Sequence, residues 1–113
     1  MACIKVTIAA GVTTSAEVDC GSGSPARIDL PSAMTGTTLT IHVKRGDGTF
    51  GPLYTDTDQP LGVITFSASK TVGFFTDDLR TVRSFKLVSN DTEVSEVTFY
   101  VWTVAFTDEG TPL

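Results

Sequence analysis

The sequence predicts an all-β protein, an antiparallel β-sandwich of about eight or nine strands, with a barrel as the alternative. Three observations indicate this class. Short segments rich in threonine, valine and phenylalanine alternate between apolar and polar residues, as strands with one buried face do. Ten glycines and five prolines separate these segments. No segment has the length and periodicity of an ordinary helix, which argues against a parallel α/β sheet.

Length and composition predict one domain that spans residues 1–113. The hydrophobic fraction is 41% and the charged fraction is 19%, which is typical of a chain that folds around a single core. The residues from about Asp108 onward are polar, so this tail is expected to fray.

The first quarter of the chain predicts three strands. Apolar residues at every second position predict an edge strand over Cys3–Ala9. A weaker strand follows over Ala16–Cys20. The glycine- and serine-rich segment Gly21–Pro25 is expected to be a loop. Strand character returns over Ala26–Leu30 and ends at Pro31, because proline cannot donate a hydrogen bond to a neighbouring strand.

The centre of the chain predicts a β-hairpin around which the other strands are organised. Thr37–Lys44 alternates apolar and polar residues and leads into Arg45–Thr49, where glycines on both sides of an aspartate favour a tight turn. The second strand of the hairpin is Phe50–Tyr54, and the polar segment Thr55–Pro60 is expected to be a turn.

The second half of the chain predicts four strands and a single turn of helix. Two short strands are expected over Val63–Ser67 and Thr71–Phe75. Thr76–Arg80 begins with a capping threonine followed by acids, so it predicts one helical turn. A strand over Arg83–Ser89 follows. The last strand is the longest and runs from Val94 or Val97 through Phe106.

Charge and hydropathy argue against two classes of partner. The formal net charge is −5 and the basic residues form no cluster, so binding to nucleic acid or to an anionic membrane is not expected. No apolar run approaches the roughly 18 residues that span a bilayer. The first residues lack the pattern of a secretion signal, so the protein is expected to be made in a cytoplasm.

The residue types that usually carry catalysis or bind metals are sparse. Cys3 and Cys20 with one histidine do not supply a zinc site. The two cysteines are expected to be small buried or half-buried side chains, although a disulfide between them is geometrically possible. His42 lies on the polar face of its strand without a nearby nucleophile, so it is expected to be a solvated histidine. We therefore expect no catalytic residue, no metal and no cofactor.

Three short acidic motifs have ordinary structural explanations. Asp56 and Asp58, like Asp77 and Asp78, are expected to form turns rather than to act as glycosidase acids, although a weak calcium site at the first pair stays open. The tripeptide at 45–47 spells Arg-Gly-Asp, which is read by integrins in matrix proteins, but a polar hairpin tip needs the same residues.

The last strand is apolar on both faces. Val97, Phe99 and Val101 form one face, and the other carries a set of residues that forms the candidate oligomer or capsid interface: Tyr100, Trp102, Val104 and Phe106. The outer face of a sandwich is normally polar. Two explanations stay open: the chain's own N-terminal segment and loops cover this face, or the face is a subunit interface, where aromatic residues are enriched.

Three segments carry a resemblance to a known group of proteins. Ile28–Thr40, Gly46–Tyr54 and Arg83–Ser89 resemble segments of small proteins encoded among the virion genes of tailed bacteriophages and prophages. Their order, a strand, an Asp-Gly-Thr turn with an aromatic residue and a late Arg-x-Phe-Lys-Leu strand, is also similar to the discoidin or galactose-binding-like jelly roll. Sugar-binding members of that fold use loop histidines, and this sequence has none in a loop.

The phage resemblance implies a virion structural protein, most simply a capsid decoration or cement subunit. Such proteins commonly form homotrimers that bind the major capsid protein on the outside of the head. The alternative is a tail-fibre or head-fibre module that binds glycans on the host surface. Its candidate contacts lie on the central hairpin: Arg45, Asp47, Phe50 and Tyr54.

Overall fold

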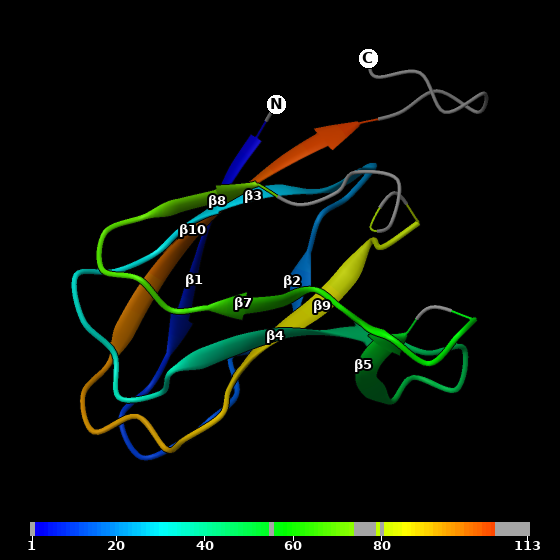
Figure 1. The fold of residues 1–113 in the computed structure, drawn as a ribbon. Coiled ribbons are helices and arrows are strands. Elements are labelled where there is room, and N and C mark those ends of the chain that lie inside the picture. Colours follow the sequence, from blue (N-terminus) through cyan, green and yellow to red (C-terminus); the bar gives the residue numbers. More distant parts are fainter. Residues whose placement is uncertain (1, 55, 74–78, 80, 106–113) are drawn as a thin grey trace.

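The computed structural model describes residues 2–54, 56–73, 79 and 81–105 (Figure 1). Within these residues the chain forms ten strands. In chain order the strands are β1 (Ala2–Ile8), β2 (Val18–Asp19), β3 (Gly23–Asp29), β4 (Thr38–Lys44), β5 (Phe50–Tyr54), β6 (Pro60–Leu61), β7 (Val63–Thr65), β8 (Thr71–Gly73), β9 (Ser84–Ser89) and β10 (Val97–Ala105).

The strands form two antiparallel sheets that pack as the layers of a sandwich (Figure 1). Sheet A has the order β1-β10-β3-β8. Sheet B has the order β2-β9-β4-β5-β6, and β7 also pairs with β4. The predicted fold class, an antiparallel β-sandwich, is therefore confirmed. No helix in the described part of the chain is long and apolar enough to span a bilayer.

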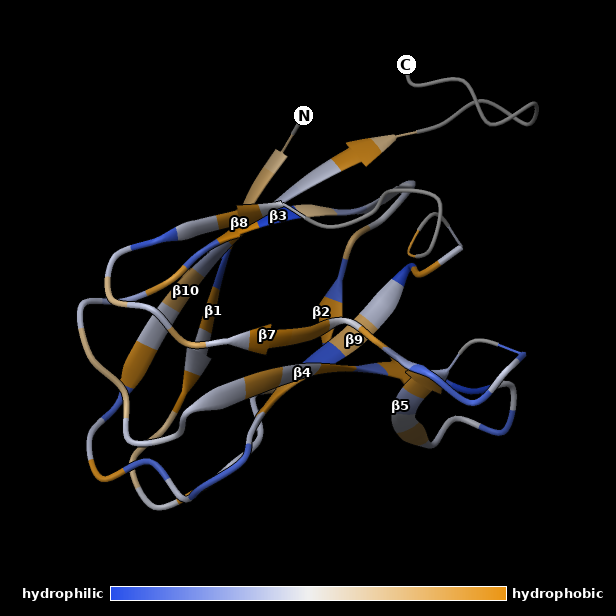
Figure 2. Ribbon diagram, viewed as in Figure 1, coloured by the Kyte–Doolittle hydropathy of each residue, from blue (hydrophilic) through white to orange (hydrophobic). Residues whose placement is uncertain are grey.

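The core lies between the two sheets and is built from the inward-facing residues of both. Along β10 the buried side chains occupy every second position, and β9 shows the same alternation. Figure 2 shows that the connections around β5 are largely hydrophilic, whereas the strands carry most of the hydrophobic residues. The buried hydrophobic residues are Val6, Ile8, Val18, Ile28, Leu30, Leu39, Ile41, Ile64, Leu79, Val82, Phe85, Leu87, Val97, Phe99 and Val101.

The central hairpin forms as predicted. Lys44 pairs with Phe50 and Val43 pairs with Gly51, so β4 and β5 are antiparallel neighbours. In the turn between them Gly48 has φ of 89°, a conformation that glycine adopts without strain. The first half of β4 pairs with β7 on the same edge that the second half uses for β5. β9 occupies the other edge of β4.

One local prediction is wrong. Gly23–Pro25 was expected to belong to a loop, but these residues are buried and begin β3. A Cβ at Gly23 would lie 3.2 Å from the Thr103 hydroxyl oxygen, so this glycine permits close contact with β10, and a β-bulge follows it. The turn predicted at Thr55–Pro60 agrees with the structure over residues 56–58, whereas Pro60 begins the short strand β6 and Thr55 lies outside the described residues.

The other predicted strands agree with the structure to within a few residues. β1 lies at a sheet edge as expected, and β10 begins at Val97 rather than Val94. The helical turn predicted at Thr76–Arg80 lies outside the described residues except for Leu79, which is buried. The tail predicted to fray from Asp108 also lies outside them.

One end of the sandwich is held together by a buried carboxylate. Glu93, in the β9–β10 connection, is 1% exposed. Its Oε1 accepts a hydrogen bond from the Thr35 amide at 2.8 Å, and its Oε2 accepts bonds from the Gly36 amide at 2.9 Å and the Ser89 hydroxyl at 2.8 Å. The backbone of Glu93 also bonds to Gly11 and Val12. Glu93 therefore joins the β1–β2, β3–β4 and β9–β10 connections into one unit.

Candidate functional site

The outer face of sheet A carries the predicted interface residues. Odd-numbered residues of β10 face the core, so even-numbered residues face outward. Tyr100 is 45% exposed, and Trp102 and Val104 are half-buried. The structure thus places these three side chains along one strand. The fourth, Phe106, lies outside the described residues.

Trp102 is held in place by two residues of the neighbouring strand β3. The Arg27 guanidinium lies over the indole ring, 4.5 Å from its centroid. The indole Nε1 donates a hydrogen bond to Asp29 Oδ2 at 3.0 Å, and the Thr71 hydroxyl donates to Asp29 Oδ1 at 2.8 Å. The bonds from Trp102 and Thr71 lower the pKa of Asp29. The indole is therefore held on both sides, and the carboxyl beside it is ionised at neutral pH.

This geometry bears on both explanations of the apolar outer face, that other segments of the chain cover it and that it is a subunit interface. β10 lies between β1 and β3, so the N-terminal strand does cover one of its edges, and Arg27 covers part of Trp102. Tyr100 is left as the exposed aromatic residue between Lys5 of β1 and Asp29 of β3, its partners in register. The outer face is therefore mixed, with an aromatic centre and polar neighbours. Its role as an interface stays a prediction.

The four hairpin residues predicted as loop contacts are not brought together. Arg45 and Asp47 lie in the turn, where Asp47 Oδ1 accepts bonds from the Thr49 amide at 3.0 Å and the Thr49 hydroxyl at 2.7 Å. These bonds lower the pKa of Asp47. The tripeptide at 45–47 thus forms the hairpin tip that its sequence predicts.

The two aromatic residues of the hairpin share a face of β5 but differ in exposure. Phe50 is half-buried under Lys86, whose Nζ lies 4.5 Å from the ring centroid. Tyr54, at the far end of β5, is 51% exposed. The Arg45 side chain lies against Gly51, whose Cβ position faces the opposite side of β5. The hairpin therefore offers one free aromatic side chain, Tyr54.

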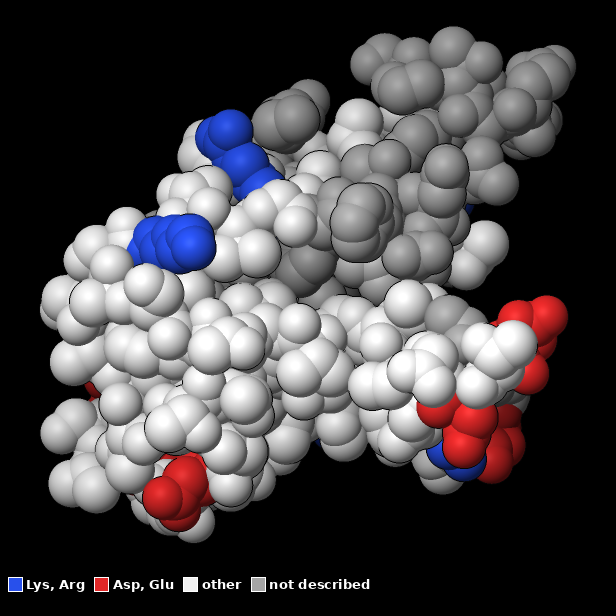
Figure 3. Space-filling view, in the orientation of Figure 1, with Lys and Arg blue, Asp and Glu red and all other residues white. Residues whose placement is uncertain are grey.

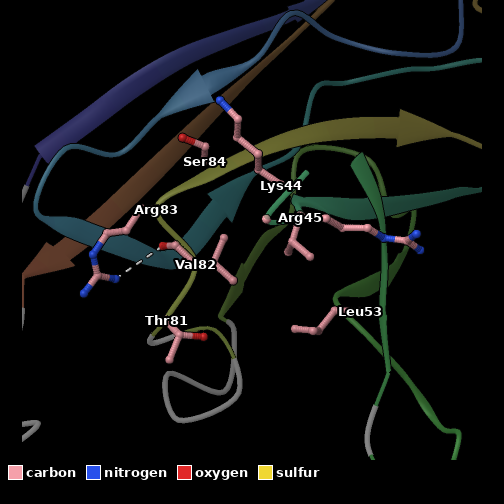
Figure 4. Close-up of a pocket in the computed structure, with 9 residues that line it drawn as sticks. Lys44, Arg45, Leu53, Thr81, Val82, Arg83 and Ser84 are labelled. Carbon is pink, nitrogen blue, oxygen red and sulfur yellow. Dashed lines mark hydrogen bonds between the residues drawn. The ribbon is translucent and has the colours of Figure 1, made fainter. Parts of the chain in front are cut away.

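A cavity of about 340 Å³ lies beside the base of the hairpin, between β4, β5 and residues 81–84 (Figure 4). Leu53 and Val82 contribute apolar side chains to it. The charged ends of Lys44, Arg45 and Arg83 point away from it in Figure 4. Lys44 approaches Glu17 at 3.5 Å, and Arg83 donates to the Ser24 hydroxyl at 2.5 Å. The side chains of Leu53 and Val82 therefore line the cavity, and the charged ends of its lining residues do not point into it.

The residues considered for chemistry lie apart from one another. His42 is half-buried on sheet B, and burial lowers its pKa. Asp56 and Asp58 are exposed in the β5–β6 connection, and the pair Asp77 and Asp78 lies outside the described residues. Among the residues that the structure describes, no three His, Cys, Asp or Glu side chains are grouped as a metal site would require.

The two cysteines are free thiols. Cys20 is half-buried as expected, and burial together with the neighbouring Asp19 raises its pKa to about 11, against a lowering effect of Arg83. Cys3 is exposed, so the expectation of burial was wrong for it. The reason is its position: Cys3 pairs in register with Trp102 and faces outward from sheet A.

Comparison with known proteins finds a likeness in fold. No protein-family model matches the sequence, and no curated protein matches it. A solved structure does. The crystal structure of the SPBc2 prophage-derived protein YomS superposes with a TM-score of 0.51 at 15% sequence identity, over 89% of this chain and 93% of that one. At that identity the likeness establishes a shared fold with a phage-derived protein and leaves the decoration role a prediction.

Sequence reasoning missed Arg27, Asp29 and Glu93. The first two become important only because β3 pairs with β10, which brings Asp29 beside Trp102 across 73 positions of sequence. Glu93 contacts Thr35 across 58 positions. A glutamate in a polar turn carries no local signal of burial, so none of these contacts could be found without the strand pairing.

Proposed function

We propose that this protein is a structural component of a phage particle, a capsid decoration or cement subunit without catalytic activity. In this role it self-associates through the outer face of sheet A and binds the major capsid protein to stabilise the head. The likeness in fold to a prophage-derived protein supports a phage origin. The net charge of −5 suits a protein that must remain dispersed at high local concentration.

One observation carries the proposal: the exposed Tyr100 stands beside an indole that Arg27 and Asp29 already hold in place. Tyrosine, tryptophan and arginine dominate the energetics of protein–protein contacts. Side chains that are ordered before binding lose little conformational entropy when a partner arrives. The outer face of sheet A therefore combines the composition and the preorganisation of a contact surface.

A second candidate function rests on Tyr54, which is 51% exposed on the hairpin. An exposed tyrosine beside polar residues can stack on a sugar ring, as a host-surface glycan-binding module of a fibre requires. The two candidates use the chain's two tyrosines, which differ little in exposure and lie on different sheets. Each tyrosine is therefore the matched control for the other.

The experiment compares Tyr100→Ser with Tyr54→Ser. Oligomeric mass is measured by sedimentation, and binding is measured to empty heads of the encoding phage and to host cell-wall polysaccharide. For a cement protein, Tyr100→Ser lowers self-association and head binding at least about tenfold, and Tyr54→Ser changes neither. Polysaccharide binding that depends on Tyr54 would favour the fibre module. The decoration role would be refuted if the wild-type protein is a monomer and does not bind empty heads.

A further inference from the structure

The end of the sandwich fixed by Glu93 exposes apolar side chains. We call this end the loop tip and define it as residues 9–12, 33–35 and 91–96. Val94 is 78% exposed and Val12 is 44% exposed. Neither position is loosely held, because Val94 N donates to the Thr35 hydroxyl at 3.1 Å and the Val12 carbonyl accepts from Glu93 N at 3.1 Å. The tip is therefore an ordered apolar surface.

A hollow of about 410 Å³ lies beside Val94. Ala33, Met34 and Val97 give it apolar walls, and Glu96 stands among its lining residues. Its size suits one aromatic side chain with space for its polar end. The Glu93 carboxylate already accepts three bonds in this structure, so the exposed Glu96 is the free acceptor for a hydroxyl that enters the hollow.

The loop tip and the outer face of sheet A have complementary charge. The tip exposes Asp91 and Glu96, and the three connections that form it contain no lysine or arginine. The outer face exposes Lys5 and Arg27 on the two strands that flank Tyr100, and Asp29 on the same face is half-buried and bonded to Trp102 and Thr71. Figure 3 shows basic side chains near β3 and β8 and acidic ones at the lower left, near the β9–β10 connection. The acidic tip is therefore complementary to the two exposed basic side chains of the outer face.

We propose that Tyr100 of one copy enters the hollow beside Val94 of a second copy, a head-to-tail contact between two different surfaces. This inference rests on the self-association proposed above and names its geometry. Lys5 and Arg27 then face Asp91 and Glu96 of the neighbour. A contact between two outer faces would instead leave the acidic tip without a basic partner. A head-to-tail contact of this kind can be repeated from copy to copy, because each pair keeps one unused tip and one unused outer face.

The test mixes two variants that lack different halves of the contact. Val94→Asp damages the hollow, and Tyr100→Ser removes the side chain that fills it. Each variant alone is expected to be monomeric in native mass spectrometry, with self-association weakened at least about tenfold. An equimolar mixture retains one intact hollow and one intact tyrosine, so it forms a 1:1 pair and nothing larger. Val63→Asp, at a valine 49% exposed on β7, is the control and keeps the wild-type mass.

The outcomes separate this inference from the function on which it rests. A wild-type oligomer that survives Val94→Asp, or a mixture that stays monomeric, overturns the head-to-tail contact and leaves self-association standing. A monomeric wild-type protein overturns both. Because Val94 is almost fully exposed, its replacement leaves the core unchanged, and an unaltered thermal unfolding midpoint confirms that loss of assembly is not loss of folding.

Discussion

Replacing Glu93 by glutamine tests the carboxylate that joins the three connections. The side chain keeps its shape but loses one acceptor. If the amide oxygen takes the place of Oε2, it keeps the bonds from the Gly36 amide and the Ser89 hydroxyl. The amide nitrogen then faces the Thr35 N–H at 2.8 Å, donor against donor. Glu93→Gln therefore leaves the part-buried Thr35 N–H without its partner and removes the charge from the other two bonds.

The expected cost follows from these bonds. A hydrogen bond to a charged group contributes about 1.5–3 kcal/mol, and a buried donor without a partner costs about 1–3 kcal/mol. We expect a loss of about 3 kcal/mol at pH 7, because one bond is lost and two are weakened. For a chain of 113 residues, the unfolding entropy near the midpoint is about 0.24 kcal/mol per degree. The midpoint of Glu93→Gln should therefore fall by about 12 °C.

The effect should also depend on pH. Burial raises the pKa of Glu93, but the bonds from Thr35, Gly36 and Ser89 lower it, and the net direction is below the ordinary value of 4.5. The folded state therefore prefers the ionised form more than the unfolded chain does. Its contribution is present above pH 4.5 and is lost as pH falls through the pKa of the folded state.

Urea unfolding of the wild type and Glu93→Gln between pH 7 and pH 3 measures both effects. The difference in the free energy of unfolding should stay constant from pH 7 to about pH 4.5 and shrink below that, because the wild-type carboxyl then becomes neutral as well. Glu96→Gln is the control, since this exposed glutamate lies in the same connection, and it should change stability by less than about 0.5 kcal/mol. A difference for Glu93→Gln under 1 kcal/mol at pH 7, or one unaffected by pH, would refute the reasoning.

Two further predictions concern glycine and cysteine. Gly36→Ala should lower the free energy of unfolding by about 2 kcal/mol, because its Cβ would collide with the Ser89 hydroxyl. Gly46→Ala is the control and should leave stability unchanged, because its Cβ enters open space. Equal urea midpoints for the two variants would contradict this prediction. At pH 8 a thiol reagent should modify Cys3 promptly and Cys20 at least about tenfold more slowly, because Cys20 is half-buried with a pKa of about 11. Peptide mass mapping identifies the modified thiol. Equal modification rates for Cys3 and Cys20 would argue against the burial of Cys20 that the structure shows.

The parts of the fold that sequence could predict are those set by local patterning. The alternation in β4 and β10 fixes which residues face the core, and the turn after Lys44 contains the glycine that a tight reversal needs. These features depend on neighbours in sequence. The predicted position of Tyr100 and Trp102 on the outer face therefore agrees with the structure.

The parts that sequence could not predict depend on contacts between distant segments. Gly23–Pro25 has the composition of a loop and becomes a strand because β10 lies against it and a bulge accommodates the proline. From the sequence, Trp102 is an apolar residue on an outer face with no identified contact. Only the pairing of β3 with β10 reveals that Arg27 and Asp29 cover part of its side chain. The strand or turn propensity of a segment does not indicate which distant segment will pack against it.

The position of β1 at the rim of sheet A affects how the molecule behaves when crowded. Its seven residues form the longest outermost strand of the described chain, and the other outermost strands, β2, β6 and β8, contain two or three residues each. A long open rim invites strand addition from another molecule, which ends in fibrils. Lys5 stands at the midpoint of that rim and would have to give up hydration beside an incoming strand. Lys5 thus opposes strand addition at the one long rim among the described strands.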